Sequence, residues 1–210
     1  MLGFIEQLTN APERTGPHDI AALRELGVTD RAIMDATYIC VGFNIINRIA
    51  DAMDFKVPPT EVFVSGTWFM RRFGYRPMSG SFVAKNGRRA RLNENVASST
   101  YPYESMMRCL HDSVFYGPGA LDSSRRRAIG DGEQIAGALG PYVSKVAQRD
   151  YKGLDECISD LRLEGYSDDQ IFEATVCAAS AASFKVLRLV LNAMMLCSHT
   201  TPKISVQSAA

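Results

Sequence analysis

One apolar stretch in the first quarter of the chain carries the polar side chains best suited to chemistry. Four of them recur at offsets of four, seven and eleven residues, which places them on one face of a helix: Cys40, Asn44, Asn47 and Asp51. Arg48 lies beside this row. A guanidinium binds carboxylate or phosphate groups through paired hydrogen bonds, and side-chain amides can orient a substrate. The pattern predicts one wall of a pocket for a small anionic molecule.

The same row has a structural interpretation, which the sequence leaves open. The asparagines could cap neighbouring helix ends, and Arg48 could pair with Asp35 or Asp51, because buried polar groups generally satisfy one another. The functional interpretation assigns substrate binding to Tyr38, Asn44, Asn47 and Arg48.

Candidate catalytic groups are His111, Glu173 and Cys40. His111 shares a predicted helical face with Glu104, Arg108 and Asp112, and an imidazole near carboxylates can act as a general acid or base. The alternative is an exposed face of ion-paired side chains. Glu173 lies in the first turn of a predicted helix, where the helix dipole alone favours a carboxylate.

Two copies of one motif must position these residues. Residues 20–37 recur without a gap as residues 158–175, with identical residues at eight of the eighteen positions. Gly27 and Gly165 can adopt the left-handed conformation that ends a helix, and Thr29 can open the next one. In the second copy, Ser167 and Gln170 have the spacing of a capping box. The repeat predicts helix, turn, helix in both places.

The expected fold is all-α, with two related halves forming one compact helical domain. Long helices are expected at about 30–53 and 168–196, and shorter ones at 60–73, 103–115, 123–129 and 141–151. The halves span 1–57 and 141–197, joined by a connecting region at 58–140 and followed by a flexible tail at 198–210. Series of short alternating runs, typical of sheets, do not occur.

Composition argues against several partners. The chain has 23 basic and 23 acidic residues, so no overall charge attracts nucleic acid, although basic runs occur at 85–91 and 125–127. No leader sequence is recognisable, which predicts a cytoplasmic protein. The apolar stretch 171–197 contains Glu173, Lys185, Arg188 and Asn192, which favours a buried helix over a membrane span. The five cysteines include no Cys-x-x-Cys pair, so we expect reduced thiols and no structural zinc.

Motifs of a known family occur towards both ends. The N-terminal ones are Leu8-Thr9-Asn10-Ala11-Pro12 and the more specific Phe43-Asn44-Ile45-Ile46-Asn47-Arg48. The C-terminal ones are Gly117-Pro118-Gly119-Ala120-Leu121-Asp122, Tyr151 and Gly165-Tyr166-Ser167-Asp168-Asp169-Gln170. On these residues the chain resembles peroxidase-related proteins of the alkylhydroperoxidase D and carboxymuconolactone decarboxylase superfamily. The matching stretches cover about half of the chain.

The resemblance implies repeated helical hairpins, a homo-oligomer, and pockets between helices or subunits. Redox members carry a glutamate, a Cys-x-x-Cys pair and a histidine, which this chain lacks, so a dithiol peroxidase cycle is not expected. We expect instead a cofactor-independent and metal-independent protein that binds a small anionic organic molecule. Its chemistry would be decarboxylation, lactone opening or isomerisation. The alternatives are a non-catalytic oligomeric scaffold, or a peroxidase that uses Cys40 or Cys177 with an external thiol.

Overall fold

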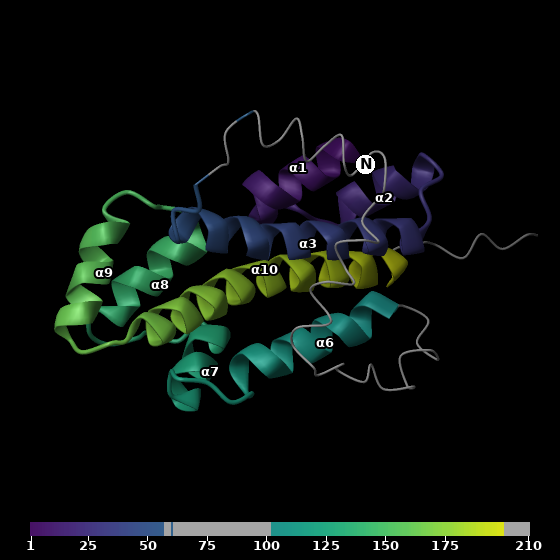
Figure 1. Ribbon diagram of the computed structural model, residues 1–210. Coiled ribbons are helices and arrows are strands. Elements are labelled where there is room, and N and C mark those ends of the chain that lie inside the picture. Colours follow the sequence, from purple (N-terminus) through teal and green to yellow (C-terminus); the bar gives the residue numbers. More distant parts are fainter. Residues whose placement is uncertain (57–59, 61–101, 200–210) are drawn as a thin grey trace, which may run out of the picture.

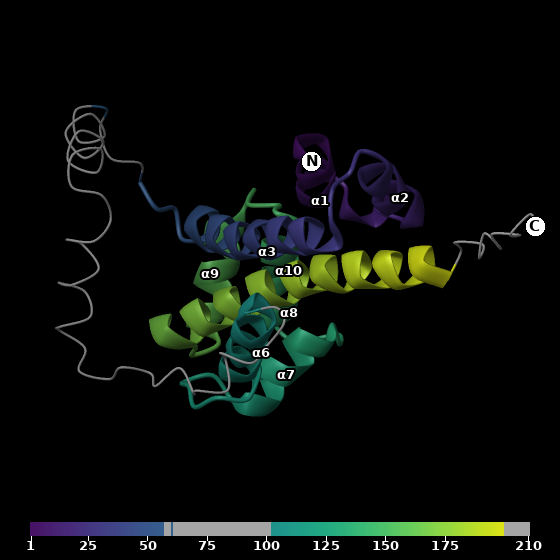
Figure 2. The same ribbon diagram turned by 90° about the vertical axis from the view of Figure 1, so that its right-hand side faces the viewer.

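Two long helices, α3 (Asp30–Ala52) and α10 (Asp168–His199), lie side by side through the middle of the protein (Figures 1 and 2). The computed structural model describes residues 1–56, 60 and 102–199, and every regular element within these ranges is helical. The all-α prediction is therefore confirmed for the described part of the chain.

Shorter helices cover both sides of this central pair. On the α3 side lie α1 (Leu2–Asn10), the 3₁₀ turn η1 (Pro12–Arg14) and α2 (Pro17–Glu25) (Figure 1). On the opposite side, α6 (Pro102–Phe115) and α7 (Ser123–Asp131) pack against α10. At one end, α8 (Leu139–Gln148) contacts both central helices, and α9 (Leu154–Leu163) packs on α8.

Small side chains occupy several buried positions of α10, where it packs against its neighbouring helices. The buried positions of α10 include Ala174, Ala178, Ala179 and Ser183, all at most 1% exposed. The distance between packed helices depends on the side chains at their contact, and small ones bring the backbones closer. Larger apolar residues from the surrounding helices, such as Leu8, Ile20 and Leu161, complete the core.

Helix α10 is long and apolar enough, by length and composition alone, to cross a membrane. Of the most apolar window, 61% is buried inside the protein, and the helix packs against α2, α3, α6, α7 and α8. Its apolar side chains are thus largely covered by the chain's own helices.

The two repeat copies have the same turn geometry. Gly27 and Gly165 both have positive φ angles, of 79° and 89°. In the first copy the Val28 amide donates to the Leu23 carbonyl at 3.0 Å, and in the second Tyr166 donates to Leu161 at 3.0 Å. The internal similarity of the sequence thus corresponds to one local structure formed twice.

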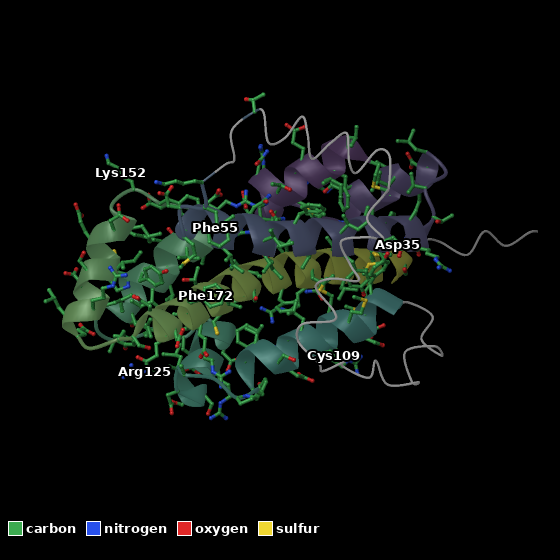
Figure 3. The ribbon with its side chains drawn as sticks, in the orientation of Figure 1. Asp35, Phe55, Cys109, Arg125, Lys152 and Phe172 are labelled. Carbon is green, nitrogen blue, oxygen red and sulfur yellow. The ribbon has the colours of Figure 1, made fainter. Side chains whose placement is uncertain are left out.

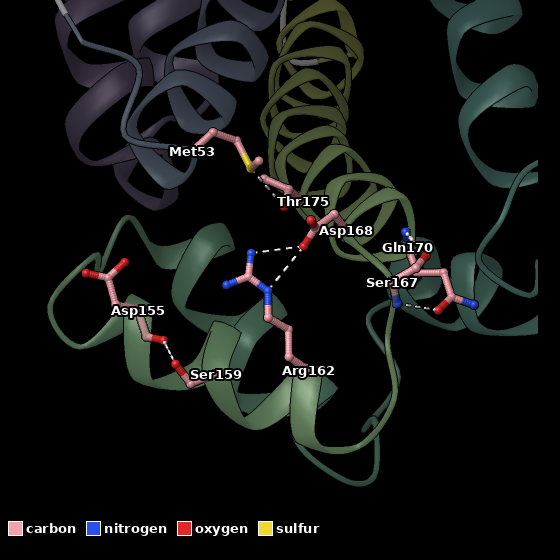
Figure 4. A network of polar contacts seen from close by, with 8 residues as sticks. All are labelled: Met53, Asp155, Ser159, Arg162, Ser167, Asp168, Gln170 and Thr175. Carbon is pink, nitrogen blue, oxygen red and sulfur yellow. Dashed lines mark hydrogen bonds and ion pairs between the residues drawn. The ribbon is translucent and has the colours of Figure 1, made fainter.

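An ion pair bridges each turn. Arg24 pairs with Asp30 at 2.8 Å, and Arg162 with Asp168 at 2.9 Å (Figure 4). Seven residues after the first residue of each long helix lies a fully buried threonine whose hydroxyl donates to the preceding turn: Thr37 to Ile33 and Thr175 to Ile171, both at 2.8 Å. Identical residues therefore make identical contacts.

The predicted caps are confirmed. The Thr29 hydroxyl accepts from the Ala32 amide at 3.2 Å and opens α3. Ser167 and Gln170 form the reciprocal capping box at the start of α10, with distances of 2.9 and 3.2 Å (Figure 4).

We expect alanine at Gly27 or Gly165 to lower the free energy of unfolding by about 1–2 kcal/mol, the cost of a left-handed backbone for a residue with a Cβ. Space is not the reason, since nothing lies within 4 Å of the added carbon at either position. The control is Gly42→Ala inside α3, which is equally open and should stabilise the helix by about 0.5–1 kcal/mol. Urea unfolding measures all three. If Gly42→Ala and Gly165→Ala changed the free energy of unfolding equally, the left-handed turn at Gly165 would be contradicted.

Most predicted helix ends agree with the structure to within two residues, and two differ further. The helix expected at 141–151 spans Leu139–Gln148, because Arg149 adopts a left-handed conformation (φ 60°) that ends it. The last helix extends to His199, past the expected start of the tail at 198. The helix predicted at 60–73, apart from its first residue, the basic run at 85–91 and the tail from residue 200 lie outside the described residues.

Candidate functional site

A cavity of about 420 Å³ lies between α3, α6 and α10. Figure 3 draws the side chains of these three helices. Its volume is within the range of small-molecule binding sites. It is lined by Met34, Tyr38, Glu104, Met107, Arg108, His111, Phe184, Leu187, Leu191, Met194 and Met195.

The cavity wall is mainly apolar and rich in methionine. Four methionines contribute to it, from all three helices, together with the ring of Phe184 and two leucines of α10. Methionine side chains are flexible and polarizable, so they adapt to ligands of different shape and make favourable contacts with aromatic rings. Such a wall suits an aromatic or branched aliphatic body.

The polar side chains at the cavity come almost entirely from α6. Glu104 and Arg108 lie one turn apart and form an ion pair, with 2.9 Å between Arg108 Nη2 and Glu104 Oε1. Both side chains are more than half exposed, so this pair is weak and screened by water. A ligand carboxylate could therefore replace Glu104 as the partner of Arg108 at little cost.

His111, one turn further along α6, is held by aromatic rings. The centroid of its imidazole lies 5.0 Å from that of Phe115 and 5.5 Å from that of Phe184, both in edge-to-face geometry. Nδ1 lies 3.2 Å from Oδ1 of Asp112, and no hydrogen bond to another described residue involves Nε2. The side chain is 40% exposed, so the ring is both oriented and reachable. This is the arrangement of an imidazole that can exchange a proton with a bound molecule.

Tyr38 joins this site from the opposite helix. It belongs to α3, is only 4% exposed, and its ring centroid lies 6.0 Å from that of Tyr103. The structure thus brings together two residues that the sequence analysis had placed in separate groups: Tyr38, a candidate for substrate binding, and His111, a candidate for catalysis.

Asn44 and Arg48 lie elsewhere, in the buried contact between α3, α8 and α10. Arg48 donates to the Asn44 carbonyl at 3.2 Å, the Ala147 carbonyl at 3.4 Å and the Ser183 hydroxyl at 3.5 Å. The predicted pairing of Arg48 with Asp35 or Asp51 is wrong: Asp35 pairs with Arg31 at 3.8 Å, and all described partners of Arg48 are neutral. Burial, followed by the charge of Arg149, lowers the pKa of Arg48.

The predicted row of four polar residues divides in two. Cys40 and Asn44 are buried, whereas Asn47 and Asp51 are exposed, and Arg48 beside the row is buried with the first two. Asn44 donates through Nδ2 to the Cys40 sulfur at 3.3 Å, and its Oδ1 accepts from Arg149. Neither the four residues of the row nor Arg48 lines the cavity between α3, α6 and α10.

Glu173 anchors a loop. Its Oε1 accepts from the Ala120 amide at 2.7 Å and its Oε2 from the Leu121 amide at 2.8 Å. A Cβ at Gly119 would lie 2.5 Å from Oε2, so any larger residue there would have to displace the carboxylate. Two backbone amides thus already bind the carboxylate, and Glu173 does not line the cavity that His111 borders.

The basic run at 125–127 serves the fold. Arg126 is 4% exposed and donates to the backbone carbonyls of Val114, Gly117 and Leu121. Arg125 stacks over the ring of Tyr166, with 5.2 Å between the guanidinium carbon and the ring centroid. These three arginines therefore do not form one basic surface patch. The sequence gives no direct sign that Arg126 is buried.

All five cysteines lie in the described residues, and none forms a disulfide bond; Cys109 is exposed on α6 (Figure 3). Burial raises the pKa of Cys177 to about 12. The thiolate is the reactive form of cysteine, and burial disfavours it at Cys177. This environment argues against Cys177 as a peroxidatic cysteine.

The described residues contain no group of three His, Cys, Asp or Glu side chains that could hold a metal ion. In the part of the chain that the structure describes, fold and site define a helical protein with a methionine-rich cavity bordered by one histidine, one arginine and one glutamate. Comparison of the chain with protein-family models, curated proteins and solved structures gave no match.

Proposed function

We propose that this protein binds a small organic acid with an aromatic or branched apolar body in the cavity between α3, α6 and α10. The observation that carries the proposal is the cavity itself, an apolar wall with polar groups gathered on one helix. An apolar body would displace water from the methionine side chains, and burial of such surface is favourable. The acidic group would face Arg108.

His111 would then move a proton on the bound molecule. Imidazole is the side chain that ordinarily exchanges protons near neutral pH, and its orientation by Asp112 and the two phenylalanines supports such a role. The reactions we propose need no cofactor: decarboxylation, lactone opening or isomerisation of an organic acid. Each requires a proton to be added to or removed from carbon or oxygen.

Two features support assignment to the alkylhydroperoxidase D and carboxymuconolactone decarboxylase superfamily, which we also propose. One is the pair of helical hairpins with identical turn contacts. The other is the set of sequence motifs around Asn44 and Gly165. The lack of a Cys-x-x-Cys pair favours proton chemistry over redox chemistry within that class.

Naphthoate, an aromatic carboxylate, is a suitable probe for titration calorimetry. We expect Arg108→Gln to weaken its binding about tenfold, the effect of losing one charge-assisted hydrogen bond. Glu104→Gln should strengthen binding several-fold, because it removes the competing carboxylate from Arg108. Opposite effects of two substitutions one turn apart exclude a general change in the fold. The proposal fails if both variants bind naphthoate like the wild type, or if the wild type does not bind it.

A second candidate function, an oligomeric scaffold, is favoured by a different surface. Ile39, Phe43 and Ile46 form a row along α3 and are 52%, 61% and 61% exposed. A row of large exposed apolar residues on one helix favours self-association. The same titration separates the candidates, since a scaffold alone would not bind naphthoate at the cavity.

A further inference from the structure

A second cavity, of about 460 Å³, lies between α7, α8 and α10. Its volume is also within the range of small-molecule binding sites. Three alanines line it from α8 and α10, namely Ala147, Ala178 and Ala181, and Ile129 and Val143 add larger apolar side chains. The small alanines leave room for a flat apolar group against the two helices. None of the described residues that line this cavity also lines the one between α3, α6 and α10, so the two sites are separate.

The loop between α7 and α8 forms one side of this second cavity and is held in place by the fold. It begins at Gly132, which ends α7 in a left-handed conformation with a φ angle of 73°. Near its other end, the Ala138 amide donates to Glu164 Oε1 at 2.9 Å. A Cβ at Gly140 would lie 2.2 Å from the Ile135 carbonyl oxygen, so the loop packs directly against the first turn of α8. A cavity that is formed in advance lowers the cost of ordering its walls around a ligand.

The charge of the second cavity comes from one carboxylate. Of the described residues that line it, Glu133 alone is charged. Glu133 is exposed, and its side chain forms no ion pair with another described residue. Helix α7 ends at this cavity and α8 begins there, so the partial charges of the two helix ends have opposite signs and offset each other. Glu133 therefore decides which ligand charge is favoured.

We propose that the second cavity binds an organic ammonium ion with a flat apolar body. An ammonium group only donates hydrogen bonds, and the cavity offers it the Glu133 carboxylate and the side-chain oxygen of Gln134 as acceptors. The apolar body would cover the alanines of α8 and α10, and removing this surface from water is favourable. This site goes beyond the proposed function, because the cavity between α3, α6 and α10 carries Arg108 and suits an anion.

Calorimetric titration of the full chain with 1-naphthylmethylammonium, which is protonated at neutral pH, tests the charge preference. We expect saturable binding that Glu133→Gln weakens about fivefold, since an ion pair with an exposed carboxylate contributes modestly. The neutral analogue 1-naphthylmethanol should bind the wild type and Glu133→Gln equally. The matched control is Asp131→Asn, which removes an exposed carboxylate outside the cavity and should leave binding of the ammonium ion unchanged.

Two further variants locate the ligand on α8. Ser144 is exposed and lines the cavity, so the indole of Ser144→Trp should fill it and weaken binding of the ammonium ion at least about tenfold. Gln148→Trp places the same indole one turn further along α8, at an exposed position outside the cavity, and should bind the ion like the wild type. Both variants should bind naphthoate like the wild type, which keeps this test distinct from that of the proposed function.

Three results would overturn the proposal. The first is a wild-type protein that does not bind the ammonium ion saturably. The second is equal binding of this ion by Ser144→Trp and Gln148→Trp, which would place the ligand elsewhere. The third is an equal effect of Glu133→Gln on the ammonium ion and on the neutral alcohol, which would remove the preference for a cation.

Discussion

Filling the cavity from two sides with Met107→Trp/Met194→Trp is expected to weaken naphthoate binding at least about a hundredfold, or roughly 2.7 kcal/mol. The two methionines belong to α6 and α10 and both line the cavity. Both are half-buried, so the larger indoles can occupy the cavity without entering the fully packed core. The ligand and the indoles would then compete for one space.

The matched control moves the same two indoles outside the cavity. Met106 lies next to Met107, and Leu196 lies two residues after Met194. They are 50% and 58% exposed, and neither lines the cavity. Met106→Trp/Leu196→Trp should bind naphthoate with the affinity of the wild type. Fluorescence and calorimetric titrations measure both variants. If the two double variants lost affinity equally, the ligand would have to bind somewhere else.

The largest effect on stability is expected at Arg126. Alanine there should lower the free energy of unfolding by about 3–5 kcal/mol, because three backbone carbonyls lose their donor inside the protein. These carbonyls belong to the end of α6 and the loop that leads to α7, so this loop should loosen first. Urea unfolding followed by circular dichroism gives the difference.

The neighbouring residue provides the control for that prediction. Arg127 is exposed and donates to one carbonyl of its own helix, that of Ser123 at 3.2 Å. Arg127→Ala should change stability by less than about 0.5 kcal/mol. Arg126→Lys should recover only part of the loss, since an ammonium cannot reach three carbonyls in the directions of a planar guanidinium. Similar values for Arg126→Ala and Arg127→Ala would contradict this role.

The helices and their turns could be predicted from the sequence because their signals are local. Gly27 and Gly165 mark helix ends through backbone conformation alone, and Ser167 with Gln170 caps a helix through contacts three residues apart. The left-handed backbone of Arg149 had no such signal, because arginine rarely adopts it, and the end of α8 was therefore misplaced.

The candidate site was harder to predict because it depends on how helices face one another. Tyr38 and His111 were each singled out, but their meeting across one cavity depends on the rotation of α3 and α6 about their axes. Residue spacing places Arg48 on a polar face of its helix. It cannot show whether that face borders a cavity or packs against another helix. A usable signal was Ser183, a small polar residue on α10 that leaves room for its guanidinium.

Arg126 was interpreted with its neighbours as part of a basic run. Its position three residues before the buried Ile129 places it on the inner face of α7, and this periodicity could have separated it from Arg125 and Arg127. A run of like charges in a sequence thus divides between buried and exposed faces once it folds into a helix.

The most direct test of the central claim is an NMR titration of the protein labelled with ¹³C at the methionine methyl groups. On addition of naphthoate, four methyl signals should shift together and saturate: those of Met34, Met107, Met194 and Met195. The signal of Met53, which contacts Thr175 at the far end of α3, should stay in place. Binding that shifts Met53 and leaves the four cavity methyl groups unchanged would contradict the assignment of the ligand site to the space between α3, α6 and α10.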